Sequence, residues 1–196
     1  ALNKKWIEYV NSLEETVKNV KMILAASRVL LDTRYDEMLK VVDAFDFKRI
    51  VYLGSNVLKG TAQESALKML ELTAGKVVTM YDTPMGFRHG PKSIVDDTTL
   101  TVVYLSDNAY TRQYEVDLIK EMSGQRKGNK IMAVSSRKDD EVAALVDYFY
   151  SFDNETDADN MYLAFEYILA AQLIALYKSL SFGITPDNPC PSGEVN

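Results

Sequence analysis

The feature that most constrains the fold is an alternation of short apolar runs with longer helix-like segments. The short runs are rich in β-branched residues and lie at residues 49–55, 76–81, 100–106, 130–135 and 148–152. Segments with helical periodicity separate most of them, at residues 57–74 and 110–122, and another follows the last run to about residue 182. This alternation is typical of a parallel sheet with helices on both faces. We predict an α/β fold, a three-layer α/β/α sandwich around a five-stranded parallel sheet, preceded by a long N-terminal helix.

Composition limits the classes of function. The 196 residues are 47% hydrophobic and 26% charged, which suits one domain with its own core. The net charge of −6 gives no general attraction to nucleic acid. The single cysteine, Cys190, excludes an internal disulfide and a cysteine zinc cluster, and the single histidine, His89, excludes a metal site built on several imidazoles. We therefore expect no metal and a reducing, cytoplasmic location.

No membrane partner is expected either. The N-terminus lacks the apolar core of a signal peptide. The most apolar stretch, residues 161–177, carries Glu166 and Gln172 and falls short of the roughly 20 apolar residues that a bilayer requires. It is predicted to be a buried core helix.

The first 45 residues are predicted to be linker helices, and residues 46–196 the globular domain. Apolar side chains spaced mostly by four and three residues form a stripe along one long helix: Trp6, Val10, Leu13, Val17, Val20, Leu24 and Leu31. The stripe packs either on its own domain or on a partner domain upstream. A second helix is expected to start at Asp32-Thr33 and to turn Met38, Leu39 and Val42 inward. The chain begins without Met and has no closing element, so we expect a fragment.

Ligands of such folds bind at the carboxyl ends of the strands. In this chain those positions are residues 54–56, 82–90, 106–108 and 135–137. The turn at Gly54, Ser55 and Asn56 leads into a helix N-terminus, where backbone N–H groups bind a hydroxyl or an anion; alternatively it is an ordinary turn between strand and helix. It does not match a nucleotide P-loop, because no Lys-Ser/Thr pair follows Gly60.

The segment 57–74 carries a narrow charged strip. At 100° per residue, Glu64, Lys68 and Glu71 fall within a strip roughly 60° wide. Apolar residues occupy the opposite face: Leu58, Ala62, Ala66, Met69 and Leu72. If the strip is enclosed, its carboxylates have raised pKa values and suit a general base. Otherwise Glu64 and Lys68 form an ordinary ion pair on a solvated face.

Two further segments carry chemistry-bearing residues. His89 lies between Arg88 and Lys92 in a Gly- and Pro-bounded loop, where it is either simply exposed or suited to anion binding and proton transfer. The acidic run 153–159 lacks the glycine and the closing glutamate of a calcium loop, and is predicted to cap the last helix.

Together these segments resemble a known family. The motifs are YLGS at 52–55, AQESALKMLELTAGK at 62–76, GFRHGPKS at 86–93, YTRQY at 110–114 and NPCPSGEVN at 188–196. They resemble the second sugar isomerase (SIS) domain of the tagatose-6-phosphate ketose/aldose isomerase family, also described as galactosamine-6-phosphate deaminase/isomerase. The resemblance covers about residues 45–196 and implies a flavodoxin-like sheet.

The resemblance also implies roles for residues. The E-x-x-x-K-x-x-E and H-G-P patterns are similar to the isomerase domain of glucosamine-6-phosphate synthase. By that similarity, Glu71 is the isomerisation base, and His89 assists ring opening from a neighbouring subunit. Glu64 and Lys68 hold and tune the site, and Gly54, Ser55, Asn56 and Arg88 are expected to bind substrate. No metal or organic cofactor is needed.

The implied reaction is the conversion of galactosamine 6-phosphate to tagatose 6-phosphate and ammonia by a homodimer or higher homo-oligomer. The loop that grips the sugar phosphate in this family lies in a first SIS domain, which this chain lacks. Two alternatives stay open. One is a non-catalytic phosphosugar-binding regulatory module, which usually carries a helix-turn-helix that residues 1–45 do not resemble. The other is a dimerisation scaffold, suggested by the striped first helix.

Overall fold

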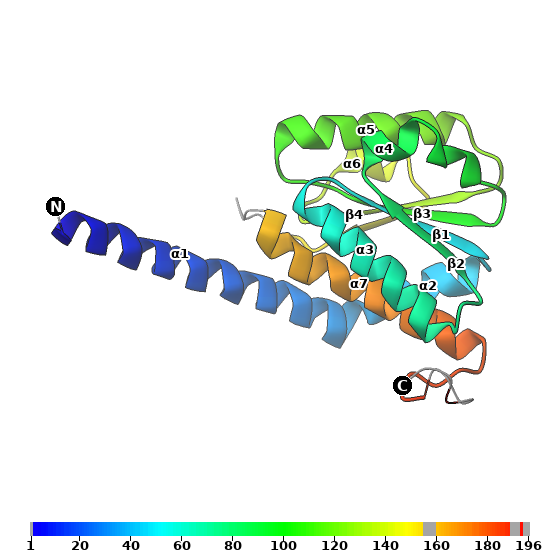
Figure 1. Cartoon of the computed structure of the whole chain (residues 1–196), viewed down its shortest axis with the longest axis horizontal. Helices are drawn as coiled ribbons and strands as arrows, with labels where there is room; N and C mark the ends of the chain where they lie inside the picture. The colour runs from blue at the N-terminus through cyan, green and yellow to red at the C-terminus, as the bar shows by residue number, and fades with distance from the viewer. Residues whose placement is uncertain (1, 155–159, 189–192, 194–196) are drawn as a thin grey trace.

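The computed structural model describes residues 2–154, 160–188 and 193. Its strands are β1 (Arg49–Gly54), β2 (Val78–Asp82), β3 (Thr99–Tyr104), β4 (Lys130–Ser135) and β5 (Tyr148–Ser151). Its helices are α1 (Leu2–Val29), α2 (Tyr35–Ala44), α3 (Val57–Leu72), α4 (Pro84–Arg88), α5 (Ala109–Gly124), α6 (Asp140–Ala143) and α7 (Asn160–Ser181), with a π-helical turn at Leu30–Arg34 and a 3-10 turn at Pro91–Ile94. The sheet is parallel in the order β2-β1-β3-β4-β5, which confirms the predicted five-stranded flavodoxin-like sandwich (Figure 1).

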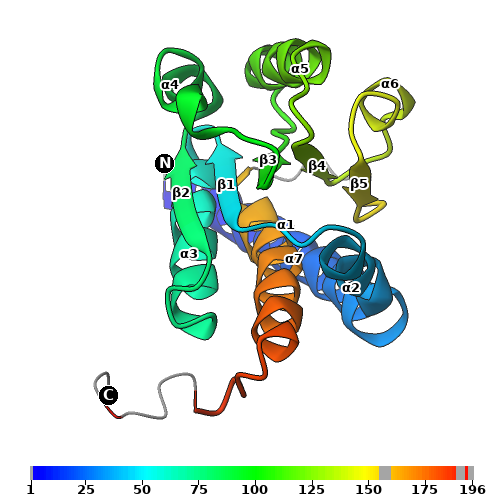
Figure 2. The same cartoon turned by 90° about the vertical axis from the view of Figure 1, so that its right-hand side faces the viewer.

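Helices cover both faces of the sheet, as Figures 1 and 2 show. Alternate residues of β1 point to opposite faces: Ile50 and Tyr52 join the core under α2, α3 and α7, while Val51 and Leu53 join the core under α4, α5 and α6. The same alternation holds for the other central strands, because side chains in a strand alternate in direction. Burial on both faces explains why the runs of the central strands β1, β3 and β4 are largely apolar rather than alternating.

Helix α7 is the helix that the apolar stretch 161–177 predicted. Within the described residues, the segment Met161–Ser181 is long and apolar enough to cross a membrane by length and composition, with half of its apolar window buried. Tyr167, Ala171 and Ile174 are buried in the core. The burial of this helix in the core confirms the predicted core helix.

The position of the first helix contradicts one of the two interpretations of its apolar stripe. The stripe side chains are exposed, from 40% at Val20 to 62% at Trp6, so the stripe does not pack on this domain. A different face of α1 packs on α7: Ile23 and Ser27 are buried there, and Leu30 of the following π-helical turn is buried in the core. In Figure 1 the N-terminal part of α1 projects beyond the sandwich. The interpretation as a helix that packs its stripe on its own domain is therefore wrong.

The predicted helix start at Asp32-Thr33 is also wrong. These residues lie inside the π-helical turn, and the helical path continues from α1 into α2 without a cap. The Thr33 hydroxyl donates to the carbonyl of Val29 instead of capping α2. The Arg34 guanidinium lies 4.4 Å from the centroid of the Tyr150 ring and donates to the carbonyl of Ser151. This turn thereby ties the α1–α2 junction to β5.

Close packing against the start of α3 requires a glycine at position 54, which the sequence alone does not reveal. A Cβ atom at this position would lie 2.2 Å from the carbonyl oxygen of Leu58, in the first turn of α3. We expect Gly54→Ala to displace the start of α3 and to lower the free energy of unfolding by about 2 kcal/mol. Gly60→Ala is the control, because nothing lies within 4 Å of its added Cβ; it should stabilise the helix by roughly 0.5–1 kcal/mol. Urea unfolding measures both, and equal effects would contradict the steric account.

Candidate active site

The charged strip of α3 forms one connected ion pair network. The Lys68 ammonium donates to Glu71 Oε2 at 2.7 Å and lies 3.5 Å from Glu64 Oε1. The hydrogen bond to Glu71 raises the pKa of Lys68, against a smaller opposing effect of desolvation. The lysine is therefore a cation that holds both carboxylates on one face of the helix.

The strip is not enclosed by the part of the chain that the structure describes. The side chains of Glu64, Lys68 and Glu71 are 45%, 33% and 47% exposed. Among the described residues no element covers the outer face of α3, so an enclosure of the strip at a subunit contact stays a prediction. Leu67 and Leu70, next to the strip, are also exposed. The strip therefore faces outward, and any enclosure has to come from a surface beyond the described residues.

The predicted His89 loop is partly helical. Thr83 caps α4 by accepting a hydrogen bond from the backbone of Gly86, and His89 is the exposed residue that ends this short helix. Arg88 lies 2.5 Å from Glu121 of α5, and Lys92 pairs with the same carboxylate. These two cations lower the pKa of Glu121. Arg88, a predicted substrate ligand, is thus already paired within the domain.

The structure does not bring the two predicted catalytic residues together. Glu71 is the penultimate residue of α3, which leads to the beginning of β2, whereas His89 follows α4 beyond the carboxyl end of β2. The five residues of β2, at a rise of ~3.3 Å each, separate the two positions. A site that used both side chains would need His89 from another copy of the chain.

The predicted turn at residues 54–56 lies at the carboxyl end of β1. Gly54 is buried, and the side chain of Ser55 forms a hydrogen bond with Glu115. Asn56 has a φ of 52° and makes no side-chain cap bond at the start of α3. Of these three residues, Asn56 alone is exposed.

A buried polar cluster near this turn was missed by sequence reasoning. Arg112 of α5 donates to Asp139 Oδ2 at 2.7 Å and to the hydroxyl of Ser135 at 3.3 Å. Arg112 and Glu115 are both buried. Their spacing with Leu118, Ile119 and Met122 on the inner face of α5 is the signal that was available, because charged residues on an apolar helix face must find partners inside.

Glu166 of α7 is a second buried carboxylate that was not predicted as a site residue. Its Oε1 accepts a hydrogen bond of 2.7 Å from Asn154, and burial raises the pKa of Glu166 to about 7. The available signal was a lone acid within an apolar stretch. The rest of the acidic run, residues 155–159, lies outside the described residues, as does Cys190 with most of the 188–196 tail.

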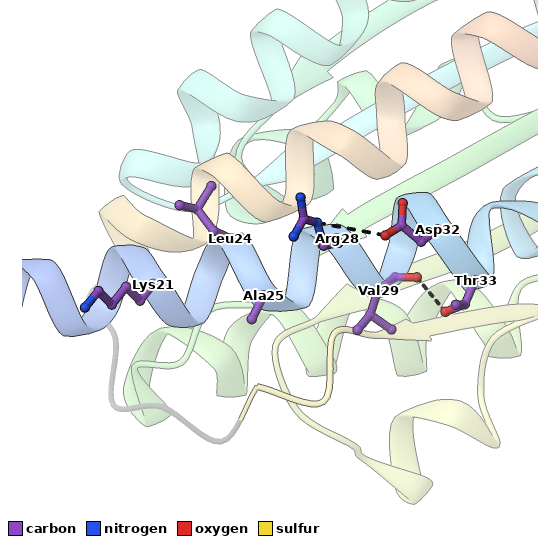
Figure 3. A pocket seen from close by; sticks show the side chains of 7 residues that line it. All are labelled: Lys21, Leu24, Ala25, Arg28, Val29, Asp32 and Thr33. Atoms are coloured by element: carbon purple, nitrogen blue, oxygen red, sulfur yellow. Dashed lines mark hydrogen bonds and ion pairs between the residues drawn. The ribbon is translucent and has the colours of Figure 1, made fainter.

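A surface groove lies away from the predicted site, and no metal-binding group is found among the described residues. An open groove of about 690 Å³ lies along α1 between Lys21 and Thr33, far in sequence from the strip (Figure 3). Among residues 2–154 and 160–188, no group of three acidic, histidine or cysteine side chains is placed to hold a metal ion.

Relatives of known name share both the sequence and the fold. The chain is 48% identical over 155 residues to the D-galactosamine-6-phosphate deaminase AgaS of Escherichia coli, a match that covers 76% of this chain and 38% of that protein. It superimposes with a TM-score of 0.91 and 45% identity on a Clostridium novyi protein assigned as a tagatose-6-phosphate ketose/aldose isomerase, over the whole chain and 50% of that structure.

The tagatose-6-phosphate ketose/aldose isomerase of Escherichia coli gives a TM-score of 0.78 at 40% identity, over 86% of this chain and 45% of that one. No protein-family model matches the chain. The chain thus spans half or less of the length of these relatives. The identity, the parallel sheet and the motifs agree: the chain belongs to the sugar isomerase (SIS) family, in the group of tagatose-6-phosphate ketose/aldose isomerases and galactosamine-6-phosphate deaminases.

Proposed function

We propose that this chain is the second SIS domain of a cytoplasmic enzyme that isomerises and deaminates an amino-hexose 6-phosphate. The proposed reaction converts galactosamine 6-phosphate and water to tagatose 6-phosphate and ammonia. The observation that carries this proposal is the Glu64–Lys68–Glu71 network, exposed on α3 in a chain 48% identical to a protein named for that deamination.

The chemistry requires a positioned base and a proton donor. In the proposal Glu71 moves a proton between C2 and C1 of the open-chain sugar, and His89 transfers the proton that opens the ring. Lys68 donates a hydrogen bond of 2.7 Å to Glu71 and so holds its carboxylate in place on the outer face of α3. The proton shift leaves an imine at C2; water adds to C2, the C2–N bond breaks, and ammonia leaves the ketose. A proton shuttle of this kind needs no metal or organic cofactor.

The exposure of the strip supports a site completed by other surfaces. An upstream domain would grip the phosphate, and the separation of Glu71 from His89 supports a homo-oligomer in which His89 comes from a second copy.

Mixing two inactive variants tests the shared site. Glu71→Gln and His89→Asn polypeptides of full length should each be inactive alone. After subunit exchange in a homodimer, random pairing should restore about a quarter of wild-type activity, because each mixed dimer holds one intact site. Absence of any recovery, with exchange shown by a tagged subunit, would place both residues in one chain.

A coupled assay for ammonia and ketose tests the reaction itself. The chain alone and the full-length polypeptide are compared on galactosamine 6-phosphate, with glucosamine 6-phosphate as the specificity control. We expect activity in the long form. Sugar-phosphate binding without turnover in both forms would instead support the regulatory module.

A further inference from the structure

The crevice between the carboxyl ends of β1 and β3 is where a doubly wound sheet ordinarily binds its ligand. In the order β2-β1-β3-β4-β5 the winding reverses there, so that α3 and α5 leave neighbouring strands toward opposite faces (Figure 2). The loops that border this crevice in the chain are residues 55–56 and 105–108. What fills the space between these loops therefore decides whether the domain offers a ligand site here.

A carboxylate from the domain itself fills it. The side chain of Glu115, in the second turn of α5, is fully buried. Its Oε2 accepts a hydrogen bond of 2.7 Å from the backbone N–H of Ser106, and the side chain of Ser55 bonds to the same carboxylate. One internal anion thus connects the loop after β1 with the loop after β3.

The groups around this carboxylate are those that hold anions in other proteins. A backbone N–H, a hydroxyl and the start of a long helix, α3, lie together there, and a helix N-terminus favours negative charge. Arg112 adds a favourable electrostatic interaction with Glu115. The Oε1 atom of Glu115 is buried without a hydrogen-bond partner among the described residues. These groups therefore surround the carboxylate but do not satisfy both of its oxygens with hydrogen bonds.

We propose that Glu115 acts as an internal ligand, whose carboxylate occupies the anion-binding crevice of this domain and excludes a phosphate or carboxylate from solution. The crevice is a small-anion site closed by its own side chain. If the proposed function holds, the substrate phosphate has to be gripped outside this crevice, and Ser55 contacts Glu115 rather than the sugar.

Nearby charges strengthen the exclusion. Asp107 interacts unfavourably with both Glu115 and Glu166, and Arg112 is already paired with Asp139 at 2.7 Å. A phosphate dianion entering the crevice would meet these carboxylates, and the Arg112 guanidinium beside them is already engaged by Asp139. Burial also raises the pKa of Glu115, as expected for a carboxylate held away from water.

Removing the side chain should reopen the site. Glu115→Ala leaves the Ser106 N–H and the Ser55 hydroxyl without their acceptor, so we expect a lower melting temperature than wild type. Sodium formate, the smallest carboxylate, should raise that melting temperature saturably, whereas sodium chloride at equal ionic strength should not. Glu115→Gln fills the same space and keeps an acceptor oxygen, so formate should not stabilise it.

A measurement on the unmodified chain keeps the test independent of whether Glu115→Ala folds. Inorganic phosphate titrated into ¹⁵N-labelled wild type should leave the Ser55 and Ser106 amide shifts unchanged, while formate should shift them in Glu115→Ala. Movement of those amides in wild type, or equal formate stabilisation of Glu115→Ala and Glu115→Gln, would overturn the proposal. None of these measurements involves turnover, so a failure here is distinguishable from a failure of the isomerase assay.

Discussion

Glu71→Gln in the full-length polypeptide should lower turnover by two or more powers of ten, about 3 kcal/mol of transition-state stabilisation, while the fold stays intact. The amide keeps the size of the carboxylate but cannot accept the proton. Glu71 is 47% exposed and makes its side-chain contact with Lys68, so its replacement leaves the core of α3 untouched. The coupled ammonia and ketose assay measures the loss, and circular dichroism with a melting curve checks the fold.

Glu64→Gln is the matched control for that result. It lies on the same strip and contacts the same lysine, but at 3.5 Å rather than 2.7 Å. We expect a smaller loss, since the proposal gives Glu64 a supporting role. Exchange of solvent deuterium into the C2 position separates the proton step from ammonia release, and it should vanish in Glu71→Gln. Wild-type exchange in that variant would remove Glu71 from the role of base.

Glu166→Gln should stabilise the domain at alkaline pH by about 3 kcal/mol and have little effect near pH 5. Burial raises the pKa of Glu166 from 4.5 to about 7. Between these two pH values the folded chain keeps a proton on Glu166 that the unfolded chain has released. The carboxyl therefore favours folding below its unfolded pKa, and stability is lost as the pH rises through the folded value. Glutamine resembles the protonated form and still accepts a hydrogen bond from Asn154.

Urea unfolding of both proteins between pH 5 and pH 9 measures this difference. Glu37→Gln, at a half-buried surface glutamate paired with Arg34, is the control with no expected gain at high pH. A constant difference between wild type and Glu166→Gln across the range would show that Glu166 does not titrate near neutrality. Repeating the series at higher salt tests the interaction with Asp107, which adds to the raised pKa.

The sequence was most informative where the cause of a structural feature acts on residues close together in the chain. Burial of a strand on both faces demands an unbroken apolar run, as in β3, and that pattern is visible without any tertiary contact. A left-handed residue after a helix favours glycine, and Gly75 has a φ of +72° and donates from its backbone to the carbonyl of Leu70, although Ala74 before it also has a positive φ of 49°. The helical period alone placed Glu64, Lys68 and Glu71 on one face.

Sequence patterns failed where the deciding partner lies far away in the chain. The stripe on α1 allowed packing on its own domain, but the face of α1 that packs there is a different one, which buries Ile23 and Ser27. The expected helix start at Asp32 is replaced by a π-helical turn, in which Arg34 contacts Tyr150 and Ser151 of β5. No local pattern contains a contact across more than a hundred residues.

The sequence by itself determined the layered α/β architecture, the order in which strands and helices follow one another, and the charged face of α3. These follow from periodicity and backbone geometry, which act over a few residues. Only the tertiary structure decided that the charged strip of α3 stays exposed among the described residues, and that Glu115 of α5 is buried against the Ser106 backbone after β3. Burial and distance depend on which segments meet after the chain has folded, and so does the chemistry that they permit.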